Sequence, residues 1–298
     1  MPKPISLFPG LLCDEVLTPK ATRLPLEAPT QRVHIADVCF DVYDPLDLSS
    51  PLLIQWGGVF DVDPGWNVEA QERGWTLVFS PLEIPSRGAQ LGLGESTLSF
   101  QRGMGERRDL EVIFHPQTRI AYASIDSSLG AVEAAFQVVL QYALRQRGGL
   151  LVHASAGYAQ GQGWLIPGPS GAGKSTAVRE GGFDEVLSDE MVAITPSPKG
   201  RTYLLWGTPF WSEGRQFEMS ARAHSLDLIT LPIKGGGPAL TPCSPAEGAR
   251  ALLKATTSYE RSSAAHSDLF EIVCLIAEQT PCAHLEFPRL GPWRDRLP

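Results

Sequence analysis

The sequence predicts an α/β fold in two portions: a mainly antiparallel β portion at residues 1–125 and an α/β portion at residues 126–298. Three observations support this prediction. Short segments in which apolar and polar residues alternate, as they do in strands, recur through the first portion. A helical repeat of apolar residues follows at residues 129–144. An apolar strand at residues 164–166 then leads into a glycine-rich loop and a further helical segment.

Composition excludes several classes of protein. The 298 residues are 43% hydrophobic and 19% charged, which provides a sizeable core and is unlike a disordered chain. The formal net charge is −8, whereas proteins that bind duplex nucleic acid carry a basic face, so we expect no nucleic-acid partner. Crossing a bilayer takes about 20 consecutive apolar residues, and no such run is present, so we expect no membrane partner.

The cysteines predict a reducing compartment. None of the five stands in a C-x-x-C pair, so we expect thiols rather than a disulfide or a metal site. Residues 5–13 contain a Pro-Gly pair and are followed by two acidic residues, so they are interpreted as an ordinary segment and not an export signal. Together these features predict a cytoplasmic protein. The five cysteines are Cys13, Cys39, Cys243, Cys274 and Cys282.

In the first portion, the proline-rich residues 1–30 are expected to form an extended arm or loop. Strands are expected where β-branched and aromatic residues alternate with polar ones between turn signals. These segments are residues 33–43, 75–79, 110–114 and 120–125.

The clearest helix is expected at residues 129–144, where apolar residues recur at helical spacing. Residues 126–128 offer N-cap side chains, and Gly148 and Gly149 are typical of a helix end. Two strands are expected next, at residues 150–155 and 164–166, with a glycine turn between them.

Residues 168–176 match the phosphate-loop (Walker A) pattern G-x-x-x-x-G-K-[ST] at every fixed position. Glycines in such a loop let the backbone wrap closely around a phosphate and turn several N–H groups toward it. In this pattern Lys174 reaches the β- and γ-phosphates, and the Ser175 hydroxyl binds Mg²⁺. The motif therefore predicts a nucleotide and Mg²⁺ as ligands. The candidate binding residues are Gly168, Ser170, Gly171, Ala172, Gly173, Lys174, Ser175 and Thr176.

An acidic pair, Asp189 and Glu190, follows soon after the motif. A helix of about 7 residues leads roughly 10 Å away from the phosphates. A strand of about 5 residues then returns by roughly 16 Å, which brings the pair back beside the loop. One carboxylate could hold Mg²⁺ while the other activates a hydroxyl. The alternative is two surface acids at the end of a strand.

The block from Arg145 to Glu213 resembles the HPr kinase/phosphorylase family, and it is closest in pattern to the HPr-kinase-like peptide kinases of lasso-peptide gene clusters. The likeness rests on the order of four features: a strand histidine, His153, the phosphate loop, the acidic pair, and a G-T-P-F loop at residues 207–210. The resemblance implies a nucleotide-binding core like that of phosphoenolpyruvate carboxykinase, with ATP and Mg²⁺ as cofactors.

The resemblance also implies roles for individual residues. Asp189 would accept the proton of a Ser or Thr hydroxyl, and Lys174 would contact the phosphates. Ser175 and Glu190 would bind the metal, although the roles of Asp189 and Glu190 could be exchanged. His153 would lie next to the phosphates, and Glu213 would face the metal or the acceptor.

We therefore expect an ATP-dependent kinase that transfers the γ-phosphate to a Ser or Thr hydroxyl of a peptide or protein. The first portion is the natural place for recognition of the acceptor. Two alternatives stay open: a nucleotide-binding regulatory or scaffold protein without phosphotransfer, and a small-molecule kinase. The sequence leaves open whether the chain forms a homo-oligomer.

Overall fold

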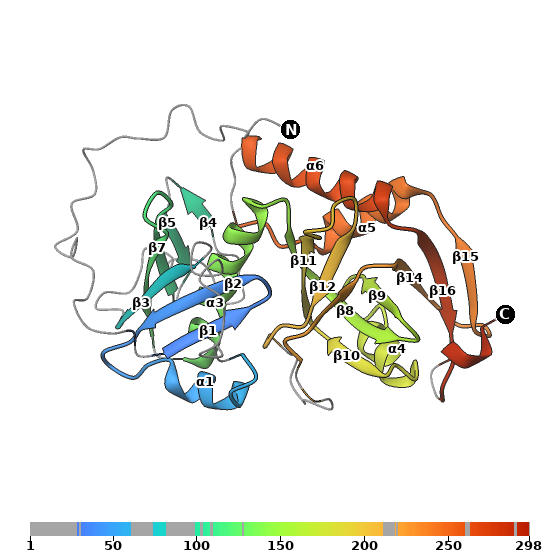
Figure 1. Ribbon diagram of the computed structural model, residues 1–298, viewed down its shortest axis with the longest axis horizontal. Coiled ribbons are helices and arrows are strands. Elements are labelled where there is room, and N and C mark those ends of the chain that lie inside the picture. The colour runs from blue at the N-terminus through green and yellow to red at the C-terminus, as the bar shows by residue number, and fades with distance from the viewer. Residues whose placement is uncertain are drawn as a thin grey trace.

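A computed structural model describes most of the chain, in two sheets with helices on their faces (Figure 1). Within the described residues, no helix is long and apolar enough to cross a membrane. The described residues are 29, 31–60, 74–81, 99–101, 104–107, 110–126, 128–210, 218, 220–259, 263–288 and 291–297.

The first sheet is mixed, and four of its six strand pairings are antiparallel. Strand β3 forms the two parallel pairings, with β2 and β7. The link from β2 to β3 contains helix α1 (Ser50–Trp56), in keeping with the long crossover, usually helical, that a parallel pair needs. In sheet order the strands are β1 (Gln31–Ile35), β2 (Val38–Tyr43), β3 (Trp75–Pro81), β7 (Ile120–Ile125), β6 (Leu110–His115), β5 (Met104–Arg107) and β4 (Ser99–Gln101).

One expected strand is in fact a hairpin. The alternating segment at residues 33–43 contains a tight turn at Ala36 and Asp37, which pairs β1 with β2. Ala36 adopts a positive φ of 56°, a conformation that an alanine rarely takes. No glycine or proline marks the turn, which is why the alternating pattern predicted one continuous strand.

Helix α3 (Leu129–Arg145) joins the two halves of the molecule. The Ser128 side chain caps its first turn by accepting a hydrogen bond from the Ala131 N–H at 3.2 Å, as the sequence predicts. Its buried side chains share one core with strands of the first sheet, and Leu151 and Ala193 of the second sheet belong to the same core. The expected division at residues 125 and 126 precedes this helix, so the core crosses that division.

The second sheet has nine strands, and β8 (Leu150–Ala159) lies at its centre. It pairs with β9 on one edge and with both β10 and β11 on the other. The remaining strands in chain order are β9 (Gln162–Pro167), β10 (Glu185–Ser188), β11 (Met191–Pro196), β12 (Tyr203–Trp206), β13 (Ala223–Ser225), β14 (Leu228–Lys234), β15 (Ala239–Pro242) and β16 (Cys282–Phe287).

Helices cover both faces of this sheet. Alternate residues of β8, such as Val152 and Ala154, pack in one core with α5 (Pro245–Ala255) and α6 (Ser263–Gln279). On the opposite face, Leu151 packs against α3, and Gly157 lies under Phe183 just beyond α4 (Lys174–Glu180). His153 and Ser155 lie between these two positions on the same face of the strand.

A disulfide joins Cys243 to Cys282, with the two Cα atoms 5.4 Å apart. The expectation of thiols without a disulfide is wrong for this pair. Cys243 directly follows β15, and the antiparallel register with β16 places it opposite Cys282, whose carbonyl accepts a 2.9 Å bond from the Cys243 N–H. The two are separated by 39 residues in sequence, so only the strand pairing reveals them as neighbours. Cys39 and Cys274 are free.

The link between α3 and the second sheet gives a testable prediction. The Gln141 side chain accepts a 2.7 Å hydrogen bond from the buried Leu151 N–H. Gln141→Met leaves that N–H without its acceptor, so we expect the free energy of unfolding to fall by about 1–3 kcal/mol in urea denaturation. The control is Gln137→Met on the same helix, which removes only a bond to Glu133 and is expected to cost about 0.5 kcal/mol or less. Equal losses in both variants would contradict this role for Gln141.

Candidate functional site

The phosphate-loop motif lies between the end of β9 and the start of α4. Gly171 and Gly173 adopt positive φ values of 74° and 97°, which glycine takes without strain. A Cβ at Gly173 would also lie 3.2 Å from the ring of Phe287, which leaves little room for a side chain. The loop backbone therefore favours glycine at both positions; Gly173 is a fixed position of the motif, whereas Gly171 is a variable one.

Lys174, the first residue of α4, is buried next to the loop. Its side chain bends back so that Nζ donates a 3.3 Å hydrogen bond to the Pro169 carbonyl. Burial lowers the pKa of Lys174, while the nearby carboxylates of Glu190 and Asp189 act in the opposite direction. The acidic turn lies close to the start of α4, because the Ser175 hydroxyl is 3.5 Å from the Asp189 carbonyl oxygen.

Strand β8 brings the loop and the acidic pair together. The Asp189–Glu190 turn connects β10 to β11, and both strands pair with the same edge of β8. The Ala154 N–H donates a 3.0 Å bond to the Glu190 carbonyl, while on the other edge Ala154 is paired with Pro167, the last residue before the loop. The two segments therefore meet across one residue of β8.

Hydroxyl groups fix the backbone of the acidic turn. Ser155 on β8 donates a 3.1 Å hydrogen bond to the Asp189 carbonyl, and Ser175 of α4 lies 3.5 Å from the same oxygen. The Ser188 hydroxyl accepts bonds from the N–H groups of Glu190 and Met191 at 3.2 and 3.1 Å. The turn is thus tied both to the central strand and to its own neighbours.

The two acidic side chains have different surroundings. Asp189 is 8% exposed, whereas the Glu190 side chain is partly exposed and forms a hydrogen bond with His153, whose Nε2 lies 3.1 Å from Oε1. The pKa of Glu190 is lowered, first by the hydrogen bond from His153 and then by the charges of His153 and Lys174, against the effect of burial. His153 therefore lies beside the site and contacts it through Glu190.

The G-T-P-F loop is anchored to the start of β11. The Thr208 hydroxyl donates a 2.6 Å bond to the Met191 carbonyl, and Phe210 is fully buried against Trp56 of α1. Residues 207–210 therefore lie next to the acidic turn. Glu213, which the resemblance assigns to the site, lies outside the described residues.

The sequence analysis missed the support beneath α4. The Trp293 indole N–H donates a 3.0 Å bond to the Ala177 carbonyl, and the Arg294 guanidinium donates a 2.8 Å bond to the Gly182 carbonyl. Trp293 packs in a small core with Trp164 and Phe287, next to the loop. The C-terminal segment therefore holds the phosphate-loop helix in place, and no local pattern in the sequence signals this long-range contact.

The described arrangement combines features that suit an anion together with a divalent cation. A glycine-rich loop and a buried lysine can bind phosphate, and hydroxyl and carboxylate oxygens are the ligands that Mg²⁺ prefers. No protein-family model matches the chain, and no curated protein sequence shows significant similarity to it. The functional conclusion must therefore be drawn from the site itself.

The His153–Glu190 pair predicts a change in titration. Because the folded pKa of Glu190 is lowered, the pair stabilises the fold above the ordinary carboxyl pKa of 4.5, and this contribution is lost as the pH falls through the lowered value. We expect His153→Ala to raise the pKa of Glu190, as measured by carboxyl ¹³C NMR titration. Glu247 is the control. Bonds from Ser244 are the main cause of its pKa of about 2, so its titration should be the same in His153→Ala. An unchanged Glu190 titration would show that His153 does not hold this carboxylate.

Proposed function

We propose that this chain is an ATP-dependent kinase of the HPr-kinase-like type that phosphorylates a Ser or Thr hydroxyl of a peptide or protein. The observation that carries the proposal is the meeting of the Asp189–Glu190 turn with the phosphate-loop motif across β8. A phosphate loop alone indicates nucleotide binding. Two carboxylates beside it add the groups that metal binding and activation of an acceptor hydroxyl require.

Binding of ATP would use residues 168–176. The loop N–H groups surround the phosphates, and Lys174 neutralises charge on the β- and γ-phosphates. Ser175 and Glu190 provide the oxygen donors for Mg²⁺, which would draw electron density from the γ-phosphate and stabilise the charge that develops during transfer. His153 is a positioning residue in this scheme, because its hydrogen bond holds the Glu190 carboxylate.

Transfer would depend on Asp189. This carboxylate orients the acceptor hydroxyl and takes its proton as the hydroxyl oxygen bonds to the γ-phosphorus. The bond between that phosphorus and the β–γ bridging oxygen breaks, and ADP leaves. The low exposure of Asp189 suits this role, because a carboxylate shielded from bulk water is held in one orientation.

The nucleotide-binding core would resemble that of phosphoenolpyruvate carboxykinase, as the family likeness implies. The β portion at residues 1–125 would recognise the acceptor. Dependence on ATP would fit a cytoplasmic location, where reducing conditions would open the Cys243–Cys282 disulfide.

The test of this proposal separates chemistry from binding. We expect Asp189→Asn to bind Mg²⁺·ATP within a few-fold of wild type in calorimetry, while transfer from radiolabelled ATP to a panel of Ser- and Thr-containing peptides falls by roughly 10²–10⁴. Glu190→Gln should instead raise the Mg²⁺ concentration needed for half-maximal transfer. The matched control is Asp184→Asn. The Asp184 carboxylate lies directly before β10 and accepts a hydrogen bond from the Gln160 N–H, away from the loop. Wild-type transfer by Asp189→Asn would contradict the mechanism, and a complete loss in Glu190→Gln alone would exchange the two roles.

A second prediction concerns the nucleotide. Lys174→Ala should weaken Mg²⁺·ATP binding or abolish turnover while the circular dichroism spectrum is retained, because the lysine compensates phosphate charge. Unchanged affinity and turnover would show that the motif does not bind ATP. Binding of ATP by the wild type without phosphorylation of any peptide would favour a nucleotide-dependent scaffold, and phosphorylation of metabolites alone would favour a small-molecule kinase.

A further inference from the structure

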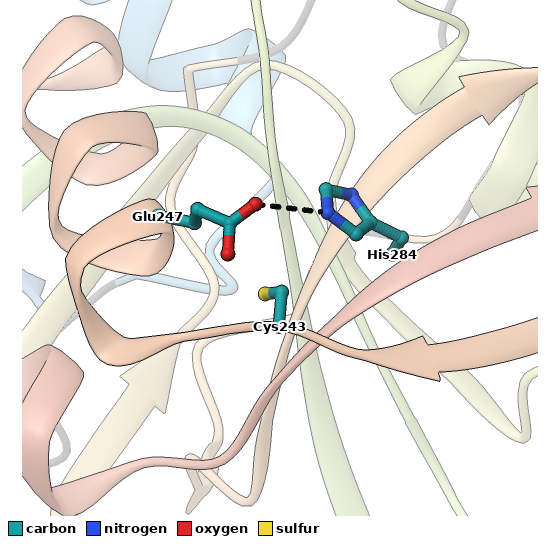
Figure 2. Close-up of side chains that lie close together, drawn as sticks. All are labelled: Cys243, Glu247 and His284. Carbon is teal, nitrogen blue, oxygen red and sulfur yellow. Dashed lines mark hydrogen bonds and ion pairs between the residues drawn. The ribbon is translucent and has the colours of Figure 1, made fainter.

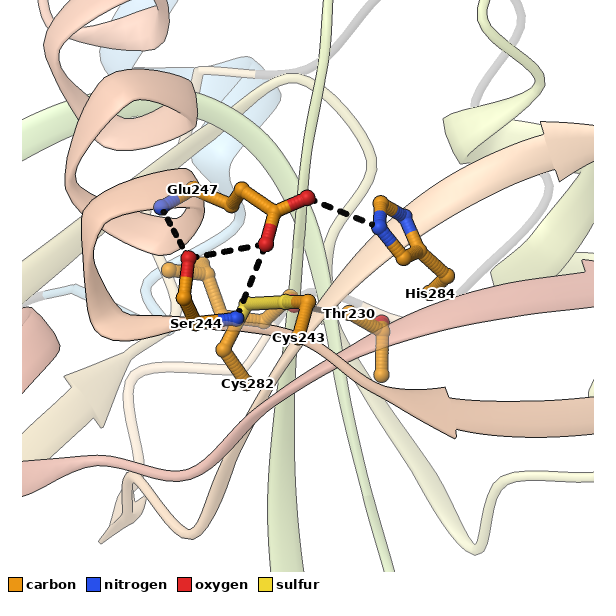
Figure 3. The surroundings of a disulfide bond; sticks show 7 residues. Thr230, Cys243, Ser244, Glu247, Cys282 and His284 are labelled. Atoms are coloured by element: carbon orange, nitrogen blue, oxygen red, sulfur yellow. Dashed lines mark hydrogen bonds and ion pairs between the residues drawn. A yellow bond between two sulfur atoms is a disulfide. The ribbon is translucent and has the colours of Figure 1, made fainter.

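A second group of chemically reactive side chains lies at the edge of the second sheet, where β15 and β16 meet the first turn of α5 (Figure 2). The ligand atoms of Cys243, Glu247 and His284 all lie within 4.8 Å of one another. Glu247 Oε1 faces His284 Nε2 at 3.2 Å, and the Cys243 sulfur lies next to this pair. The disulfide joins the Cys282 sulfur directly to the Cys243 sulfur (Figure 3).

The fold places these four residues by two independent constraints. Strand pairing sets Cys243 opposite Cys282, and His284 lies on the same face of β16 as Cys282 because it is two residues further along. The capping box of α5 sets the glutamate: Glu247 Oε2 accepts bonds from the N–H and hydroxyl of Ser244 at 2.9 and 2.8 Å. This bond pattern leaves Oε1 directed at His284.

The cluster is separate from the proposed kinase site. Phe287, which contacts the phosphate loop at Gly173, is five residues further along β16 than Cys282. Five residues of strand span roughly 16 Å. None of the four side chains contributes to the candidate phosphate loop or the acidic turn, so the kinase mechanism gives them no role.

We propose that Cys243, Cys282, Glu247 and His284 bind one Zn²⁺ ion when the disulfide is reduced. Thiolate, imidazole and carboxylate groups are all ligands of zinc, and four of them satisfy its tetrahedral coordination. All four lie on ordered elements of the sheet edge and the α5 cap. The exposed fractions of His284 and Glu247, 32% and 42%, leave the site open to metal from solvent.

The disulfide form and the zinc form are alternatives, because a sulfur in a disulfide is a poor ligand for zinc. Hydrogen peroxide is a suitable oxidant for the interconversion. The two zinc-bound thiolates, one H₂O₂ and two protons give the disulfide, two water molecules and free Zn²⁺. The sulfurs lose two electrons and the peroxide O–O bond gains them. A dithiol reductant reverses the change by thiol–disulfide exchange.

The test is a zinc titration of the full chain without nucleotide. After reduction with a phosphine and its removal under anaerobic conditions, we expect the wild type to bind one equivalent of Zn²⁺ against a chromophoric chelator. Oxidation with H₂O₂ should release it. Replacement by Co²⁺ should give the intense absorption of tetrahedral cobalt with thiolate ligands.

Variants assign the ligands. His284→Gln keeps both cysteines and is expected to weaken zinc binding by roughly 10–100-fold or more. Cys243→Ser with Cys282→Ser should abolish both zinc binding and the cobalt thiolate band. The matched controls are His266→Gln, an exposed histidine on α6, and Cys39→Ser with Cys274→Ser, the free cysteines of the described residues, which should all bind like the wild type.

Two results would overturn the proposal. One is a reduced wild type that binds no more zinc than Cys243→Ser with Cys282→Ser. The other is full retention of zinc after the disulfide has formed, as established by thiol counting. Because these readouts involve no ATP, they are independent of the kinase proposal. The zinc results would be the same whether or not Asp189→Asn loses phosphotransfer.

Discussion

The pairing of strand β8 with β9 on one edge and with both β10 and β11 on the other is the constraint on which the candidate site depends. At Ala154 this strand contacts the residue that precedes the phosphate loop and also the Glu190 carbonyl. The end of β9 and the Asp189–Glu190 turn are therefore held at the same level of the sheet, on opposite edges of β8. Any proposal for phosphate and metal chemistry in this protein relies on that register.

The surrounding packing keeps the register rigid. Side chains on one face of β8 share a core with α5 and α6, and on the other face α3 and α4 flank the site. Trp293 also holds α4, through the hydrogen bond from its indole N–H to the Ala177 carbonyl. On this face of β8, His153 and Ser155 lie between the positions covered by α3 and α4, and both contact the acidic turn. The cluster of Cys243, Cys282, Glu247 and His284 at β15 and β16 is a separate site. Strand register and the α5 cap position its side chains.

Several elements were predictable from local sequence patterns. Helix α3, the strands on either side of the loop and the return of Asp189 to it all follow from short-range spacing, because helix rise and strand rise fix how far the chain travels. Features that depend on long-range pairing were not predictable. The Cys243–Cys282 disulfide and the Trp293 contact arise from neighbours that no local pattern specifies. The turn at Ala36 is local, but no glycine or proline marks it. Tertiary structure also determines which of the two carboxylates, that of Asp189 or that of Glu190, is directed toward residues 168–176.

Hydrogen–deuterium exchange with and without saturating Mg²⁺·ATP tests most directly whether the loop and the acidic turn form one site. We expect slower exchange at residues 168–176 and also at residues 188–191, with little change in α5. Protection of both segments should disappear in Lys174→Ala. Protection of the loop without the acidic turn, or of neither segment, would contradict the claim that the two form one nucleotide site across β8.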